Sequence, residues 1–70
     1  MKITDAKSYG EAIRKRRKEL GYTQAYLTEF TGFSVSFISD LERGKATAEI
    51  GKSIYHTNLL GMDLCMENRG

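Results

Sequence analysis

The sequence predicts an all-α fold, a small four-helix domain, and three observations lead to this class. The chain has 70 residues, which is enough for one small domain. Four segments with helical spacing of apolar residues are each followed by a glycine, where a left-handed helix cap favours a residue without a side chain; these are Gly21, Gly32, Gly44 and Gly61. Proline is absent, and 40% hydrophobic with 29% charged residues is typical of a globular domain, which excludes disorder and a membrane span.

The first helix is expected over about residues 6–20. Asp5 can cap its N-terminus, while Ser8 and Glu11 form a competing capping box one turn later. We favour the earlier start. The face predicted to pack inward then carries Tyr9, Ala12, Ile13, Arg17 and Leu20.

Positive charge is concentrated in this first helix. Residues 1–20 carry seven Lys or Arg against three Asp or Glu, a net +4, whereas residues 21–70 carry four against six, a net −2. Five of the positive charges form the run Arg14-Lys15-Arg16-Arg17-Lys18. Such a run is typical of a phosphate-facing surface and equally of a solvated helix face, so the run alone leaves both interpretations open.

The next two helices are expected over about residues 24–31 and 34–43, capped by Thr23 and Ser34. Gly32 opens a tight turn between them. Apolar or small side chains occupy the inner positions of both helices: Leu27 and Thr31, with Phe30 alongside, in the first, and Phe37, Ile38 and Leu41 in the second. This arrangement indicates a helix-turn-helix, although a helical hairpin that only packs would share the glycine and the caps.

The chain beyond residue 45 has weaker patterns. A fourth helix is expected over about residues 48–60, capped by Thr47, with an apolar face of Ile50, Ile54, Leu59 and Leu60 that polar residues interrupt. Residues 62–67 alternate imperfectly and predict a short strand. A lone strand needs a partner, either residues 2–4 or the same segment of a second chain, and pairing across a dimer axis is simpler. The predicted dimer interface comprises Met62, Leu64 and Met66.

Together these segments resemble the phage repressor and Cro-type helix-turn-helix domains, the XRE family. The resemblance spans about residues 9–61 and is carried by Ile13-Arg14-x-Arg16-Arg17-Lys18-x-Leu20-Gly21-Tyr22-Thr23-Gln24-x-x-Leu27, Thr31-Gly32-Phe33-Ser34 and Phe37-Ile38-Ser39-Asp40-Leu41-Glu42-Arg43-Gly44-Lys45. The ending Leu60-Gly61-Met62-Asp63-Leu64 is similar to the small HipB-like antitoxin branch, in which a C-terminal strand pairs between the two subunits of a dimer.

The resemblance implies roles for the motif residues. The helix at 34–43 would lie in the major groove of double-stranded DNA, with base-contacting residues Val35, Ser36, Ser39 and Asp40. Phosphate contacts are expected from Thr23, Gln24, Ser34, Arg43 and Lys45. None of the four base-contacting side chains makes a strong bidentate contact, and the two serines are also compatible with plain exposed helix positions.

Four further residues have structural expectations. The resemblance implies that Arg17 and Glu42, each on an otherwise apolar helix face, form an ion pair between the first and third helices. His56 is expected at an exposed or interfacial helix position, and Cys65 in a buried strand or interface. A single cysteine forms no internal disulfide, and His56 has no neighbour at metal-ligand spacing, so a cytoplasmic location and no metal are expected.

The predicted function is that of a homodimeric, sequence-specific DNA-binding transcriptional regulator, in particular a repressor. The antitoxin resemblance adds a cognate toxin as a partner. The alternative is a protein-interaction module that keeps the scaffold without specific DNA binding, for which the short side chains and the acid Asp40 argue. We expect no enzymatic activity and no cofactor, because the sequence has no nucleophile paired with a general base, no metal cluster and no phosphate loop. We also expect no membrane segment.

Overall fold

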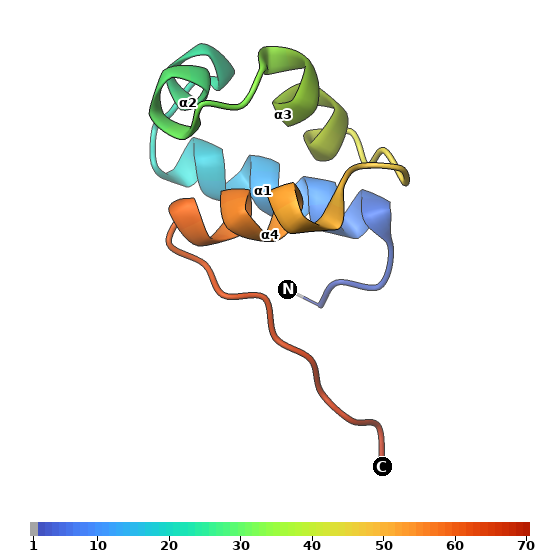
Figure 1. Ribbon diagram of the computed structural model, residues 1–70. Coiled ribbons are helices and arrows are strands. Elements are labelled where there is room, and N and C mark those ends of the chain that lie inside the picture. The colour runs from blue at the N-terminus through green and yellow to red at the C-terminus, as the bar shows by residue number, and fades with distance from the viewer. Residues whose placement is uncertain (1) are drawn as a thin grey trace.

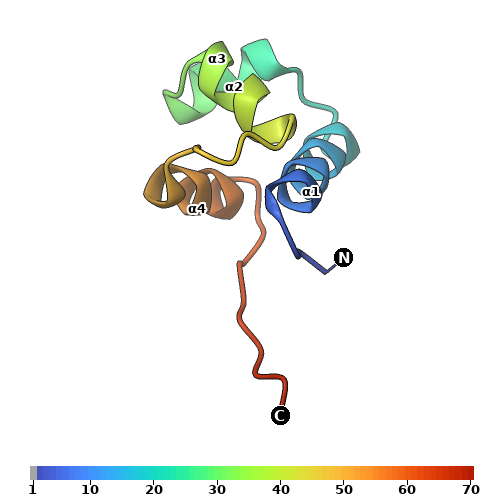
Figure 2. The ribbon, with the colours of Figure 1, turned by 90° about the vertical axis from the view of Figure 1, so that its right-hand side faces the viewer.

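The computed structural model describes residues 2–70, and these contain four helices: α1 (Ala6–Glu19), α2 (Gln24–Thr31), α3 (Val35–Glu42) and α4 (Ile50–Leu59). In Figure 1, α2 and α3 form an upper layer, and α1 and α4 lie side by side beneath them. Figure 2, turned by 90°, shows the same two layers, with both chain ends leaving on the lower side. The predicted all-α, four-helix class is confirmed.

Side-chain caps start the first three helices. Asp5 accepts a hydrogen bond from the backbone N–H of Ser8 at 2.7 Å, and the Ser8 hydroxyl accepts one from the backbone N–H of Asp5 at 3.1 Å. This capping box confirms the earlier start of α1. Thr23 and Ser34 each accept a hydrogen bond from the backbone N–H three residues later, at 3.0 and 3.1 Å. The start of α2 therefore agrees with prediction, and α3 begins one residue later than expected.

The predicted cap of the fourth helix is wrong. The residue before α4 is Glu49, which makes no capping side-chain hydrogen bond, and Thr47 lies in the preceding turn. The backbone N–H of Ala48 donates to the carbonyl oxygen of Lys45 at 3.2 Å, so this stretch forms a turn. Ala48 packs against the core from this turn, and α4 begins about two residues later than predicted.

The core of the described chain takes apolar side chains from α1, α2 and α3 and from the residue that ends α4. Its buried members are Ile13, Leu27, Ile38, Leu41 and Leu60. Partly buried residues surround it: Tyr9, Leu20, Tyr22, Phe33, Phe37, Ala48 and Met62. Burying one such aliphatic side chain contributes about 1.5–3 kcal/mol, so this small cluster is the main apolar link among the helices.

Gly10 allows α1 to lie against the last turn of α3. A Cβ atom at this position would lie 2.7 Å from the carbonyl oxygen of Glu42 and nearer still to that of Leu41. The two backbones therefore touch where Gly10 has no side chain. No sequence pattern had predicted a role for this glycine.

The inner face of α4 differs from the predicted one. Ile50 is 71% exposed and Ile54 is also exposed, whereas the positions turned inward are Ser53, His56 and Thr57. His56 is fully buried, with its ring centroid 5.9 Å from that of Phe33, so its predicted exposed position is wrong. The rotation of α4 about its axis therefore places the interrupting polar residues inside.

The C-terminal segment contains no strand within the described residues. After Gly61 the chain runs away from the helices without regular structure (Figure 1). Met62 is half-buried, but Leu64 is exposed and Met66 is 98% exposed, and Cys65 is exposed where a buried position was predicted. No backbone hydrogen bond joins the segment to residues 2–4, and a strand without a partner is not stable.

Candidate nucleic-acid interface

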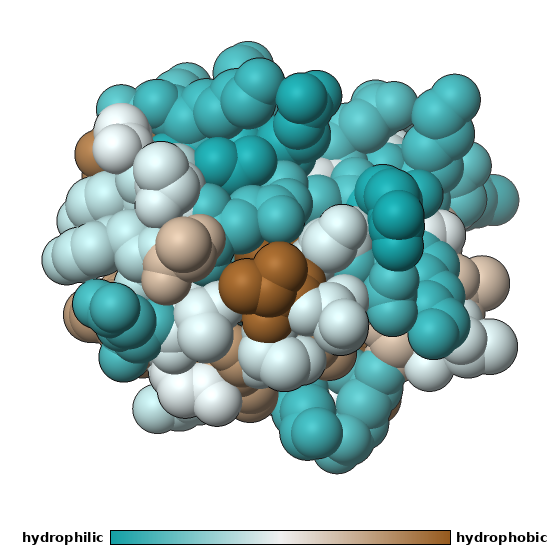
Figure 3. Space-filling view, turned by 90° about the horizontal axis from the view of Figure 1, so that it is seen from above, coloured by the Kyte–Doolittle hydropathy of each residue, from teal (hydrophilic) through white to brown (hydrophobic). Residues whose placement is uncertain are grey.

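Four residues form what we term the α3 outer face: Val35, Ser36, Ser39 and Asp40. Val35 is 47% exposed, Ser36 is exposed, and the other two are half-buried, while Ile38 on the opposite side of α3 is fully buried. Figure 3 looks down on the layer of α2 and α3 and shows a mostly hydrophilic surface with a small hydrophobic patch near its middle. The four side chains predicted to contact bases are therefore all accessible to solvent, Val35 and Ser36 more so than Ser39 and Asp40.

Asp40 pairs with two of the cations expected to contact phosphate. Arg43 Nη2 donates to Asp40 Oδ1 at 2.6 Å, and Lys45 Nζ lies 3.3 Å from Asp40 Oδ2. These two cations hold the pKa of the Asp40 carboxyl below its ordinary value, the hydrogen bond from Arg43 being the larger cause. Gly44, with a φ of 81°, makes the reversal that returns Lys45 to Asp40. The three side chains together carry one net positive charge, not two.

Beneath the α3 outer face lies a buried group that we term the polar network: Arg17, Glu42 and Gln24. Arg17 donates from Nε to Glu42 Oε2 at 2.7 Å and from Nη2 to Glu42 Oε1 at 2.9 Å. It also donates from Nη1 to the carbonyl oxygen of Tyr22 at 2.8 Å. Hydrogen bonding to Glu42 raises the pKa of Arg17 above its ordinary value, so the guanidinium stays charged. Arg17 thereby joins α1 to α3.

Gln24 is the third member of the polar network. Its side-chain Nε2 donates to Glu42 Oε1 at 3.1 Å, which adds α2 to the link between α1 and α3. The amide predicted to contact DNA phosphate is therefore bound to Glu42 in this structure. The backbone N–H groups of Gln24 and Ala25, at the start of α2, donate to no backbone acceptor in residues 2–70. Unpaired N–H groups at a helix start attract anions, so this end of α2 can bind a phosphate.

The basic run of α1 divides into bound and unbound cations. Arg17 belongs to the polar network, and Arg16 donates from Nε to the carbonyl oxygen of Leu60 at 2.9 Å. The other three, Arg14, Lys15 and Lys18, form no ion pair with any described residue. The run is therefore structural at two positions and unpaired at three.

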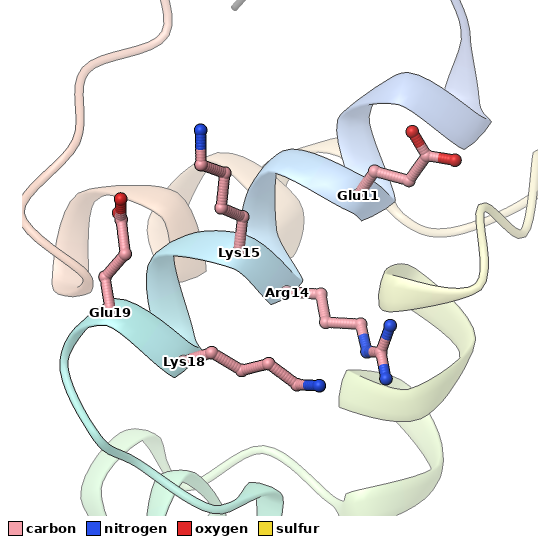
Figure 4. Close-up of a pocket in the computed structure, with 5 residues that line it drawn as sticks. All are labelled: Glu11, Arg14, Lys15, Lys18 and Glu19. Atoms are coloured by element: carbon pink, nitrogen blue, oxygen red, sulfur yellow. The ribbon is translucent and has the colours of Figure 1, made fainter.

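The three unpaired cations line a shallow surface depression on α1 together with Glu11 and Glu19. Figure 4 shows that Arg14 and Lys18 extend to one side of α1, the side of α2 and α3, whereas Lys15 and Glu19 extend to the opposite side. The charges of the run thus face two different directions.

Phe30, expected alongside the inner face of α2, lies instead in a row of surface aromatic side chains with Tyr26 and with Tyr22, which precedes α2. The ring centroids of Tyr22 and Tyr26 lie 4.8 Å apart, and those of Tyr26 and Phe30 lie 6.3 Å apart. Tyr26 is 48% and Phe30 51% exposed. Their spacing of four residues was the available signal, because residues four apart are neighbours on a helix surface.

The geometry is that of a helix-turn-helix: two short capped helices, a glycine turn, and one helix with an uncovered outer face. Comparison with known proteins agrees, since the Helix-turn-helix family model matches residues 13–53. The chain belongs to this family, which confirms the resemblance to XRE-type domains. It is also 40% identical over 55 residues to a protein of Sinorhizobium fredii named "Uncharacterized HTH-type transcriptional regulator y4mF", covering 79% of this chain and 72% of that protein.

In residues 2–70 no group of three or more His, Cys, Asp or Glu side chains is placed to hold a metal ion. Over the same residues, no helix is both long and apolar enough to cross a membrane.

Proposed function

We propose that this protein is a sequence-specific, double-stranded DNA-binding transcriptional regulator that inserts α3 into the major groove. The observation that carries the proposal is the uncovered α3 outer face, backed by the polar network that joins α3 to α1 and α2. The major groove of B-DNA is about 12 Å wide and admits a helix. A helix held rigidly by buried hydrogen bonds presents its outer side chains to base edges in a constant orientation.

The proposed base contacts follow from the chemistry of each side chain. Val35 can pack against a thymine methyl group, and Ser36 and Ser39 can donate to or accept from a base edge. Asp40 can accept a hydrogen bond from cytosine N4 while it remains paired with Arg43. Because these side chains are short, the backbone of α3 must approach the bases closely.

Phosphate contacts are proposed on both sides of α3. Thr23 and Gln24 at the start of α2, and Ser34 at the start of α3, offer hydroxyl, amide and backbone donors. Arg43 and Lys45 follow α3 and are both more than half exposed as side chains. These contacts set the position of the domain on the duplex and carry no sequence information themselves.

We propose that the protein acts in the cytoplasm, without enzymatic activity, as a homodimeric repressor. The exposed residues Leu64 and Met66, on a segment whose backbone has no partner, support pairing of residues 62–67, with Met62, across the dimer. Two subunits would then contact half-sites about one helical turn apart. The ending Leu60–Leu64 supports an antitoxin role, with a cognate toxin as the partner.

A second candidate function is a protein-interaction module that does not bind specific DNA. Two observations favour it: the half-exposed rings of Tyr26 and Phe30 on α2, and the pairing of Arg43 and Lys45 with Asp40, which lowers the positive charge beside α3. Exposed aromatic side chains are common in protein interfaces.

Selection from random duplex DNA distinguishes the two functions. A DNA-binding regulator enriches a palindromic sequence, and its affinity for that duplex falls steeply with salt concentration. Ser36→Glu would weaken binding to the selected duplex by about 5- to 150-fold or more, corresponding to about 1–3 kcal/mol or more, with an unchanged melting temperature. A protein that enriches no sequence and shows no salt-dependent DNA binding is the interaction module instead.

A further inference from the structure

The unpaired cations of α1 are the largest charged feature that the proposed contacts leave unused. The cations near α3 have carboxylate partners, since Arg43 and Lys45 pair with Asp40. By contrast, Arg14 and Lys18 have no carboxylate within ion-pair distance in the described chain, although Glu11 and Glu19 line the same depression. Their full charge is therefore available to an external anion.

Arg14 and Lys18 lie on one side of α1, four residues apart, and we term them the basic row. Gly10, four residues before Arg14, touches the backbone of the last turn of α3. Arg17, which directly precedes Lys18, donates to Glu42, and Glu42 also accepts a hydrogen bond from Gln24. The basic row therefore runs beside the polar network, from the end of α3 toward the start of α2, and Figure 4 shows both side chains extending to that side.

Like charges four residues apart on a helix repel each other, so the basic row destabilises α1 while it has no counter-charge. Bound phosphates remove this repulsion. The rise along four helical residues is about 6 Å. Phosphates on one DNA strand follow each other every 3.4 Å or so along the duplex axis, so two cations at the helical spacing can each contact a phosphate of the same strand.

We propose that Arg14 and Lys18 contact the DNA phosphate backbone that flanks the base pairs contacted by α3. The basic row extends the phosphate-binding surface from Thr23 and Gln24 onto α1 and lengthens the DNA segment covered by one domain. This inference rests on the proposed DNA-binding function. Lys15 extends to the opposite side of α1 and makes no such contact.

The test measures the dissociation constant of the full chain for the selected duplex across a range of salt concentrations. For Arg14→Gln with Lys18→Gln, the slope of log affinity against log salt should decrease by about 1.8, since each lost phosphate contact removes about 0.9. Lys15→Gln, compared with Arg14→Gln alone, is a control of equal charge change and should leave the slope unaltered. Arg14→Lys with Lys18→Arg should keep the parent slope.

A shortened duplex locates the contact. Removing the flanking base pairs should reduce the salt slope of the parent protein and leave that of the double variant unchanged. Thermal unfolding by circular dichroism checks that all variants fold with a cooperative transition.

Three outcomes overturn the inference. If the double variant binds DNA with the same salt slope as the parent, Arg14 and Lys18 do not contact phosphate, while the proposed DNA-binding function is unaffected. If Lys15→Gln lowers the slope as much as Arg14→Gln does, the effect arises from general attraction by net charge and not from contacts of the basic row. If the double variant keeps the parent salt slope for DNA but no longer binds polyglutamate as the parent does, the basic row binds an acidic protein instead of DNA. Absence of salt-dependent DNA binding by the parent protein overturns the proposed function itself.

Discussion

In the motif half of the molecule, the buried Glu42 carboxylate accepts three hydrogen bonds, two from Arg17 and one from Gln24. In α4, both ring nitrogens of the equally buried His56 lack a partner among the described residues. The same helix exposes Ile50, which apolar packing would be expected to cover. Arg17, Glu42 and Gln24 thus form hydrogen bonds across three helices, whereas the buried ring of His56 forms none with the described residues. The other buried polar side chains of α4, Ser53 and Thr57, are hydrogen-bonded.

This difference indicates which part of the fold contributes most to its stability. A buried charge with all its hydrogen bonds made is costly to disturb, because removing one partner leaves the other charge buried and unpaired. A buried neutral imidazole without a partner contributes no such linkage and keeps a desolvation cost. We therefore expect substitutions in the motif half to have larger effects on stability than substitutions in α4 or in the C-terminal segment.

The largest expected effect is that of Arg17→Ala. It leaves Glu42 buried without its main partner, and the free energy of unfolding should fall by about 3 kcal/mol. Urea denaturation followed by circular dichroism measures this. Arg16→Ala, which removes one hydrogen bond to the carbonyl oxygen of Leu60 and leaves no buried charge unpaired, is the control and should cost much less. Equal stability of Arg17→Ala and the parent would show that the polar network does not hold the motif together.

The next effect compares two helical glycines, one in each half. Gly10→Ala inserts a methyl group against the backbone of α3 and should destabilise the domain by about 1–3 kcal/mol. At Gly51 in α4, an added Cβ meets nothing nearer than a carboxylate oxygen of Glu49 at 3.8 Å. Gly51→Ala should therefore stabilise the protein, by about 0.5–1 kcal/mol. Thermal melts test this comparison: Gly10→Ala should lower the melting temperature, and Gly51→Ala should raise it.

His56 should make stability depend on pH. Burial holds the pKa of His56 below its ordinary value, and the nearby Glu42 charge opposes this shift only in part. In the unfolded chain the imidazole titrates near its ordinary pKa of about 6.5. Below that pH the unfolded state binds a proton that the folded state does not, so stability is full above about pH 6.5 and decreases on acidification.

The measurement is urea denaturation at pH 7.5 and pH 5.5, for the parent and for His56→Phe. The loss of stability at the lower pH should be smaller in the variant, because a phenyl ring does not titrate. A variant that loses as much stability as the parent would assign the pH dependence to other groups.

The smallest effect on stability, and the sharpest on assembly, is expected from the C-terminal segment. Leu64→Asp changes an exposed side chain, so the melting temperature of the isolated domain should move little. If residues 62–67 pair between two chains, the substitution should convert a dimer into a monomer in analytical ultracentrifugation. Asp63→Asn is the control and should leave the mass unaltered, whereas a parent protein that is already monomeric would contradict the proposed pairing.

Local signals were sufficient for the motif and insufficient for α4. The caps Asp5, Thr23 and Ser34 act over three residues, so their hydrogen bonds could be predicted without any tertiary contact. Thr47 had the same chemistry, yet a turn closed by Ala48 and Lys45 occupies that stretch. Whether a cap or a turn forms there depends on how the chain packs beneath α3, which no local pattern contains.

The candidate interface shows the same division. The positions of the α3 outer face came from the resemblance to XRE-type domains, and helical spacing supported them, because Ile38 and Leu41 had to be buried on the other side. The pairing of Asp40 with Lys45 required the reversal at Gly44, and the contact of Gln24 with Glu42 required α2 to lie against α3. Interactions between helices depend on distances that helical periodicity does not specify.

By itself, the sequence determined the all-α class, the boundaries of the first three helices to within a residue or so, and membership of the helix-turn-helix family. Those features depend on caps, glycine positions and apolar spacing, which act within a few residues of the chain. Only the tertiary structure decided that His56 is buried, that Ile50 is exposed, and that the basic run of α1 faces two ways. These outcomes depend on the rotation of each helix about its axis, and contacts with the other helices set that rotation.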